Sequence, residues 1–412
     1  MTRARRFLLV VVACLATSAV VPVAARGAPT HARGVVPPPT AWIQQIRDAI
    51  GDRPVSVAVG VDGTLWYRHL DWVPRPPASN EKLLLSMALY DRFPATMTFQ
   101  TQAMIAKAPG PAGRVRGDLW IVGHGDPEVG RDDLRALAKA IAKAGVTAIR
   151  GGVVGDTGPF GRDWFAPGWK DYFPAYYVAF PTALTFQDNV SRSGVHIHDP
   201  ELRAARFLTT ALKALGIKVR KEPSARQMTG SMLPVAEVRS PPLSAIVRRM
   251  DLKSRNFYAE VLGKKLGSVA YGRGTIANAA RAIHTFTTAH GVAFTEHDAS
   301  GLSYANRATA NGIVHLLWDA DQAPWVDVLQ ASLPQAGQGT LEGRLGSVPL
   351  RAKTGTLRDA SALSGWVWLE RSGQWAEFSI LSSGFSEWTA KAIEDRIVRA
   401  ISANAVDPTS PV

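Results

Sequence analysis

The sequence predicts a mixed α/β (α+β) fold in which an antiparallel sheet flanked by helices is interrupted by an inserted α/β module. Apolar residues alternate near both ends of the 412-residue chain, at 55–61 and at 363–381, as they do in strands. Between 201 and 320 they recur at helical spacing, and residues 97–154 alternate between strand and helix patterns. Since strands from both chain ends are expected in one sheet, the middle segment is expected to be an insertion.

The first 25 residues are typical of a secretory signal peptide. Arginines at positions 3, 5 and 6 precede an apolar stretch that ends at Val23-Ala24-Ala25, a small-residue cleavage site. We therefore expect secretion across the cytoplasmic membrane, into the periplasm or the extracytoplasmic cell envelope. The only cysteine, Cys14, lies within the apolar stretch, so its lipidation stays open. The cysteine of a lipobox would stand at the end of the apolar stretch, whereas here the stretch continues well beyond Cys14. Cleavage near Ala25 removes Cys14 and any disulfide chemistry.

The chain is basic. Its formal net charge of +13 falls to about +10 when residues 1–25, with three arginines and no acids, are removed. A solvated surface and an attraction to an anionic wall or membrane polymer explain this charge equally well. We expect no more than a loose association with the membrane or wall surface, because no later segment is long and apolar enough to span a bilayer. Basic and aromatic residues are not interleaved, so no nucleic-acid partner is expected.

Residues 26–90 are assigned to the first part of the main domain. A helix is expected at 41–50, followed by a β-hairpin that turns at Asp62-Gly63. Prolines at 74, 76 and 77 then stop regular structure, and helix-forming residues run from Lys82 to Leu89. Ser79 is therefore expected in the first turn of a buried helix, where free backbone N–H groups gather.

The spacing of Ser79 and Lys82 is the first indication of chemistry. Residues i and i+3 share a helix face, so the two side chains are expected to be neighbours. A serine hydroxyl becomes a nucleophile when a base takes its proton, and a lysine in a dry site can be that base because burial disfavours its charge. A capping serine followed by a solvated lysine has the same spacing, so Ser-x-x-Lys alone is weak evidence.

Residues 91–198 are assigned to the inserted α/β module. An amphipathic helix is expected at 131–144. The expected strands are 97–99, 117–122 and 148–154. An aromatic run follows at 172–177. Because apolar periodicity is sustained, we expect a compact module.

Residues 199–412 are assigned to the second part of the main domain, which ends in a hairpin at 363–381. The expected helices are 201–215, 242–250, 256–266, 308–320 and 387–402. Two more short motifs occur here. Ser254-Arg255-Asn256 lies between two helices, and Lys353-Thr354-Gly355-Thr356 precedes the hairpin. Each motif alone has an ordinary alternative as a cap or a turn.

Ser-x-x-Lys, Ser-x-Asn and Lys-Thr-Gly, in that order, form the signature of penicillin-recognising serine enzymes. Further matching stretches lie at 117–127, at 298–303, and at 339–341 with Arg344. The chain thus resembles the D-alanyl-D-alanine carboxypeptidases/endopeptidases of the low-molecular-mass class C penicillin-binding proteins, peptidase family S13. The resemblance implies a serine transpeptidase/β-lactamase-like domain with an insert between its first two motifs. The long separation of Ser79 from Ser254 leaves room for that insert.

The resemblance also implies acyl transfer at Ser79. This residue would attack the carbonyl between two D-alanines at the end of a peptidoglycan stem peptide, with Lys82 as the expected base. Ser254 would relay a proton to the leaving amine, and Asn256 would hold Lys82 and the substrate amide. Water would then release the acyl-enzyme. β-Lactam antibiotics would act as inhibitors by acylating Ser79.

The resemblance also implies that the third motif, residues 353–356, binds the substrate. Lys353 would bind the terminal carboxylate with help from Thr354, and Gly355 would leave space for substrate beside the strand. The oxyanion would lie between the backbone N–H groups of Ser79 and Thr356. Two neighbouring lysines are costly to charge together, so Lys82 is expected to lose its proton more easily while Lys353 stays protonated.

Three features depart from the family's usual pattern. Arg255 stands where the family often has aspartate, and Ala299 replaces a usual glycine. Asn189 passes almost directly to Asp199, so a small module that the family often carries there is missing. That puts a substrate or regulatory role of the module in doubt, but not the chemistry.

Two alternatives stay open. A β-lactamase would use the same residues with fast deacylation, although no separate deacylating motif is present and the long insert argues against it. A non-catalytic wall-binding protein would keep the fold, although the intact motifs argue against that. No cofactor or metal is expected: His196 and His198 share a strand face but lack a third ligand nearby, and 123–125 lacks the spacing of a dinucleotide-binding loop.

Overall fold

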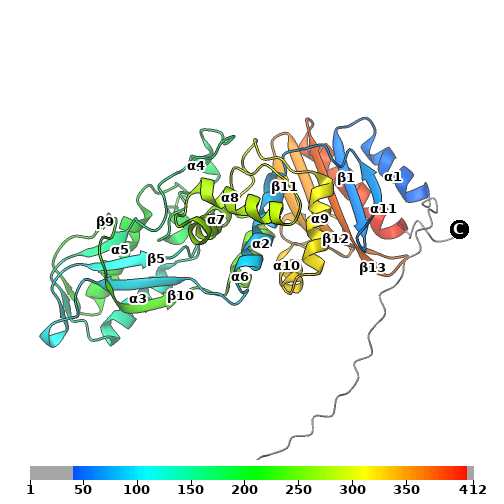
Figure 1. The fold of residues 1–412 in the computed structure, drawn as a ribbon. Helices are drawn as coiled ribbons and strands as arrows, with labels where there is room; N and C mark the ends of the chain where they lie inside the picture. Colours follow the sequence, from blue (N-terminus) through cyan, green and yellow to red (C-terminus); the bar gives the residue numbers. More distant parts are fainter. Residues whose placement is uncertain (1–39, 406–412) are drawn as a thin grey trace, which may run out of the picture.

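The structure, a computed structural model, describes residues 40–405. The predicted signal peptide, with Cys14 and the cleavage site, lies outside the described residues. Figure 1 shows two lobes joined by a group of helices: the main sheet at one side and a smaller α/β lobe at the other. Across the described range, no helix is both long and apolar enough to cross a membrane.

The main sheet is built from both ends of the chain, as predicted. Its five strands are antiparallel neighbours in the order β11-β12-β13-β1-β2. Their bounds are β1 Val55–Val61, β2 Thr64–His69, β11 Leu350–Leu357, β12 Ala360–Leu369 and β13 Gln374–Ser383. Register places Val55 opposite Ser382, so the first strand pairs with the last one in the sequence.

Helices cover both faces of this sheet. On β12, Leu363 and Val367 pack into a core shared with helices α1 and α11, whereas Ala362 and Trp366 pack into the core of the helical group. The bounds are α1 Thr40–Ile50, α2 Glu81–Arg92, α6 Leu243–Lys253, α7 Asn256–Tyr271, α8 Ile276–Ala289, α9 Ala310–Asp321, α10 Val326–Ser332 and α11 Glu387–Asn404. Residues 81–90 of α2 are all buried, the polar side chains of Glu81, Lys82 and Ser86 included.

The second lobe has its own sheet, in the order β10-β3-β5-β7-β9, and its own apolar core. Its larger elements are β3 Gln100–Ile105, β5 Leu119–Gly123, α3 Arg131–Lys143, β7 Val153–Asp156, α5 Pro200–Ala214, β9 Ser224–Arg226 and β10 Leu233–Arg239. Smaller elements are β4 Arg114–Val115, β6 Ala148–Ile149, α4 Phe173–Tyr176 and β8 Lys218–Val219. The strand expected at 97–99 instead begins at Gln100.

The core and the sheet of this lobe include residues after 198, the limit of the inserted module expected from the sequence. Helix α5 contributes to its core, and β9 and β10 complete its sheet. The chain enters and leaves the module side by side: Ser240 N donates to Phe99 O (2.9 Å) and Leu243 N donates to Met97 O (2.7 Å). We propose that the inserted module comprises the residues between these two points rather than 91–198.

Candidate active site

Ser79 lies in a short 3₁₀ turn, Ala78–Asn80, that continues directly into α2. The expected first α-helical turn is thus tighter than predicted. Ala78 has a φ of +47°, a left-handed conformation that costs a residue with a Cβ roughly 1–2 kcal/mol. Its carbonyl oxygen packs against Gly301, where an added Cβ would come within 1.8 Å of that oxygen. Only glycine at 301 allows this approach, so the turn is held in place from outside.

Lys82 is fully buried one helical turn after the serine. Its Nζ donates to Ser79 Oγ (3.1 Å), to Asn256 Oδ1 (2.8 Å) and to the backbone oxygen of Ser300 (2.5 Å). Burial lowers the pKa of this ammonium to about 8, although the buried carboxyls of Asp298 and Glu260 act against the shift. A lysine that loses its proton easily and lies within hydrogen-bond distance of a hydroxyl has the position of a general base.

The loop 298–303 supplies the third acceptor for Lys82. The carboxylate of Asp298 holds the loop together. It accepts hydrogen bonds from Trp169 Nε1 (2.6 Å), Gly301 N (3.0 Å), Ser303 N (2.9 Å) and Asn306 Nδ2 (2.8 Å). Glu260 accepts from the N–H groups of Ala299 (3.1 Å) and Ser300 (2.8 Å). These bonds fix the Ser300 carbonyl. This stretch matches the family pattern in sequence, but its role could not be predicted because nothing local indicates that it meets α2.

The second motif lies where α6 ends and α7 begins. Ser254 closes α6 with a φ of +53°, and its Oγ accepts from Lys353 Nζ (3.0 Å). Asn256 is the first residue of α7; its Nδ2 donates to Tyr177 O (3.1 Å) while its Oδ1 accepts from Lys82. The structure thus brings the first, second and third motifs together.

Lys353 is fully buried on β11 and also donates to Thr354 O (2.9 Å). Burial, followed by repulsion from Lys82, lowers the pKa of Lys353 to about 7, and only Asp251 opposes this shift. Lys82 has more acidic groups around it than Lys353, and these favour its charged form. Both pKa values are lowered mainly by loss of solvent.

Gly355 has a different effect from the one expected. A Cβ at this position would lie 2.7 Å from Pro77 O and 3.1 Å from the Ala78 Cβ. The glycine therefore allows β11 to pack closely against the turn before Ser79, instead of leaving space for substrate. Its neighbour Thr354 donates through Oγ1 to Thr340 Oγ1 (2.7 Å).

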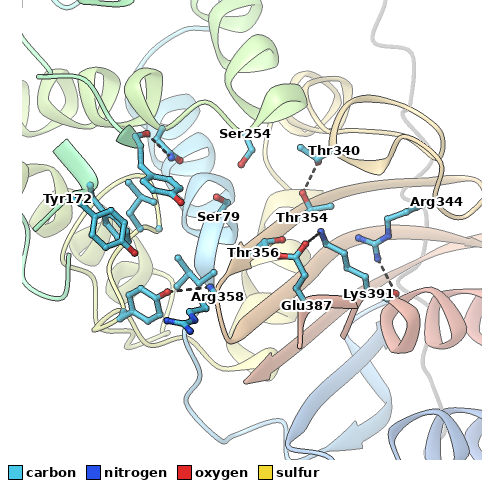
Figure 2. Close-up of a pocket in the computed structure, with 17 residues that line it drawn as sticks. Ser79, Tyr172, Ser254, Thr340, Arg344, Thr354, Thr356, Arg358, Glu387 and Lys391 are labelled. Atoms are coloured by element: carbon cyan, nitrogen blue, oxygen red, sulfur yellow. Dashed lines mark hydrogen bonds and ion pairs between the residues drawn. The ribbon is translucent and has the colours of Figure 1, made fainter. Parts of the chain in front are cut away.

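A cavity of about 620 Å³ opens over these motifs (Figure 2). Of the predicted residues, Ser79, Ser254, Asn256, Thr354 and Thr356 line it, while the two lysines lie buried behind them. Its lining also includes residues to which no role was assigned, among them Tyr172, Tyr177, Tyr304, Thr340, Arg344, Glu387 and Lys391. The aromatic run at 172–177 was visible in the sequence, but Glu387 and Lys391 carry no local signal and reach the site only through the fold.

The histidines have structural contacts. His196 Nδ1 contacts Pro174 O, and the ring of His198 lies 4.9 Å from that of Phe180. His196 forms only an isolated bridge with Val190, so the expected strand face is not formed there. Within residues 40–405, no group of three His, Cys, Asp or Glu side chains is arranged to hold a metal ion.

Comparison with known proteins gives matches over most of the chain. The model of the D-Ala-D-Ala carboxypeptidase 3 (S13) family matches residues 55–196 and 187–404. A D-alanyl-D-alanine carboxypeptidase of Actinomadura sp. (strain R39) is 30% identical, covering 78% of this chain and 76% of the relative. Carboxypeptidase DacB of Mycolicibacterium smegmatis is 28% identical, covering 78% of this chain and 74% of the relative. The fold is similar to that of penicillin binding protein 4 (dacB) from Haemophilus influenzae, with a TM-score of 0.75, 19% identity and coverage of 85% of this chain and 97% of that chain.

Proposed function

The chain belongs to the D-Ala-D-Ala carboxypeptidase 3 (S13) family, and on that basis we propose that it is a serine-type D-Ala-D-Ala carboxypeptidase/endopeptidase acting on peptidoglycan stem peptides. The observation that carries this proposal is the contact of Ser79 Oγ with the buried Lys82 Nζ at 3.1 Å. The relatives named above are carboxypeptidases of the same reaction class. The proposed site consists of Ser79, Lys82, Ser254 and Asn256 for catalysis, with Lys353, Thr354 and Thr356 for substrate.

Acylation follows from this arrangement. Lys82, in its neutral form, takes the proton of Ser79 Oγ as this oxygen attacks the carbonyl carbon of the penultimate D-alanine. The C–N bond then breaks, and the proton passes to the leaving amine through the hydroxyl of Ser254. Asn256 keeps Lys82 in position, because the two side chains are 2.8 Å apart. Water then hydrolyses the ester on Ser79 and releases the trimmed peptide.

Two further groups orient the substrate in this proposal. The backbone N–H groups of Ser79 and Thr356 would stabilise the developing oxyanion. Lys353 and Thr354 would bind the carboxylate next to the scissile amide. A bound carboxylate would raise the pKa of Lys353 again, so substrate itself would keep this lysine charged. Since stem peptides belong to a wall polymer, we propose an extracytoplasmic location.

The direct test is labelling with a fluorescent penicillin, together with release of D-alanine from a pentapeptide ending in D-Ala-D-Ala. We expect a stable covalent label and D-alanine release. A transient label with rapid drug turnover would indicate a β-lactamase instead. Absence of both label and D-alanine release would indicate a non-catalytic wall-binding protein.

Acylation should become faster as the pH rises toward the pKa of Lys82. Only the neutral amine can accept the Ser79 proton, and the pKa of Lys82 is about 8. Below this value the rate should increase about tenfold per pH unit, and above it the rate should level off. The second-order acylation rate constant of a penicillin methyl ester, which has no carboxylate, measures this dependence alone.

The parent penicillin provides the matched comparison. Its carboxylate needs a protonated Lys353, whose pKa of about 7 makes the charged form scarce at high pH. The rate for penicillin should therefore fall again at alkaline pH, while the rate for the ester stays high. An ester rate that decreases as the pH passes through the pKa of Lys82 would contradict a neutral lysine base.

Replacing Arg255 with alanine should leave acylation nearly unchanged. Its guanidinium donates to the Tyr258 hydroxyl (2.9 Å), pairs with Asp188 (2.8 Å) and does not line the cavity. We expect the penicillin acylation rate of Arg255→Ala to stay within about tenfold of the wild-type rate, a barrier change of at most about 1.4 kcal/mol. A thousandfold loss would show that Arg255 takes part in the site.

A further inference from the structure

The cavity over Ser79 has two chemically different ends. One end is aromatic: the Tyr172 ring is 5.9 Å from that of Tyr177, and Phe173 links Tyr177 (5.2 Å) to Tyr304 (6.4 Å). The other end is charged and lies beyond Thr354, where Arg344, Glu387 and Lys391 complete the lining. Figure 2 shows Glu387 and Lys391 on the opposite side of Ser79 from Tyr172.

The charged end of the cavity has a fixed position in the fold, because helix α11, which carries Glu387 and Lys391, is hydrogen-bonded to Arg344 and to the main sheet. Arg344 is 13% exposed and donates to Glu394 Oε2 (2.8 Å) and Asp395 Oδ1 (2.7 Å) of α11. Glu394 in turn accepts from Ser361 Oγ of β12 (2.6 Å). These bonds hold α11 next to β12, which pairs with β11, the strand that carries Thr354.

Lys391 differs from Arg344 in being available to a ligand. Its Nζ pairs with Glu387 Oε1 at 3.0 Å, and the two side chains are 31% and 39% exposed. Such a solvated i,i+4 pair is weak and exchanges partners readily. Of the four charged residues that line the cavity, Arg344, Arg358 and Lys391 are basic and Glu387 is acidic. Arg344 is already paired with Glu394 and Asp395, so Arg358 and Lys391 are the basic groups of this lining that can meet an incoming carboxylate.

We propose that Lys391, held by Glu387, forms a subsite for the departing peptide strand of a cross-linked substrate; this inference rests on the proposed function. The carboxylate next to the scissile amide is assigned to Lys353 and Thr354. A free D-alanine leaving group ends there. When the leaving amine belongs to a diamino diacid instead, its side chain and the second peptide must continue beyond Thr354, where α11 begins. The carboxylates of that second strand would bind Lys391.

The test compares two substrates by kcat/KM: a pentapeptide ending in D-Ala-D-Ala, and a dimer in which D-alanine acylates one α-amine of a diamino diacid that continues into a second peptide. Lys391→Ala should lower the dimer-to-pentapeptide ratio about fivefold, as expected for the loss of one charge-assisted contact. Lys391→Glu should lower it further, because it repels the carboxylates. Arg399→Ala is the matched control: Arg399 pairs with Asp395 on the same helix and does not line the cavity. It should leave the ratio unchanged.

An unchanged ratio in Lys391→Glu would overturn the subsite. So would an equal fall for both substrates, which would indicate a structural role of the ion pair, or wild-type protein that trims the pentapeptide but does not cleave the dimer. In each of these cases penicillin labelling and D-alanine release would still support the proposed function. Wild-type protein that releases no D-alanine and takes no label would overturn the proposed function as well.

Discussion

Ser79→Ala should abolish covalent labelling by penicillin, the largest effect expected for any single substitution in this chain. The acyl bond is proposed to form on Ser79 Oγ, and alanine offers no atom in its place. D-alanine release should fall by a factor on the order of 10⁴ or more, the scale found when a nucleophile is removed from a group that acts as a unit. Lys82 would keep its bonds to Asn256 and Ser300, so the folded state should persist.

The site of labelling can be read without ambiguity by mass spectrometry. Trypsin does not cut between Arg75 and Pro76, so the proposed nucleophile lies in the tryptic peptide 69–82. Ser79 is the only hydroxyl-bearing residue of that peptide. The penicilloyl adduct should therefore be found on this peptide in the wild type and nowhere in Ser79→Ala. An adduct on any other peptide would overturn the assignment of the nucleophile and of the three motifs.

Lys82→Ala should slow acylation by about a thousandfold, within the range that general bases contribute. The serine hydroxyl would remain, but within residues 40–405 no other side chain in hydrogen-bond contact with it could take its proton. The rate constant for penicillin acylation measures this loss, and the melting temperature reports whether the variant is folded. A loss smaller than about tenfold would assign the base elsewhere.

A second buried lysine provides the control for this substitution. Lys264 of α7 is also fully buried and donates to Gly161 O (2.9 Å) and Asp163 O (3.0 Å), away from the cavity lining. Lys264→Ala should lower the melting temperature, because it leaves buried acceptors without a donor. The fraction that remains folded should still be acylated at close to the wild-type rate. The contrast separates loss of the base from loss of a buried amine.

The sequence predicted best what depends on short spacing. Ser79 and Lys82 lie one turn apart, and a helix spacing was enough to make them neighbours. Strands β1 and β2 were found because alternation and a tight turn are local signals. The hydrogen bond from Lys82 to the backbone oxygen of Ser300 could not be predicted from local spacing, because it depends on how a buried loop packs against α2.

The wider limit proposed for the inserted module could not be predicted from the sequence for a related reason. Strand β9 pairs in parallel with β7, and β10 pairs with β3 across the whole module. Such pairings depend on the completed sheet rather than on the local pattern. The acidic surroundings of Lys82 could not be predicted either, because Asp298 and Glu260 approach this lysine only in the folded chain.

The contacts of Ser240 and Leu243 with residues 97–99 also have a consequence for the order of folding during synthesis. All strands of the inserted module lie between residues 100 and 239, so the module can close as soon as this segment has emerged. The main sheet cannot, since β1 needs β13 and the intervening contacts are distant in sequence. Until β11 and β13 arrive, Ser79 lacks Lys353 and the strand beside it. A partly synthesised chain would therefore carry a folded module and a Ser79 whose surrounding site is still incomplete.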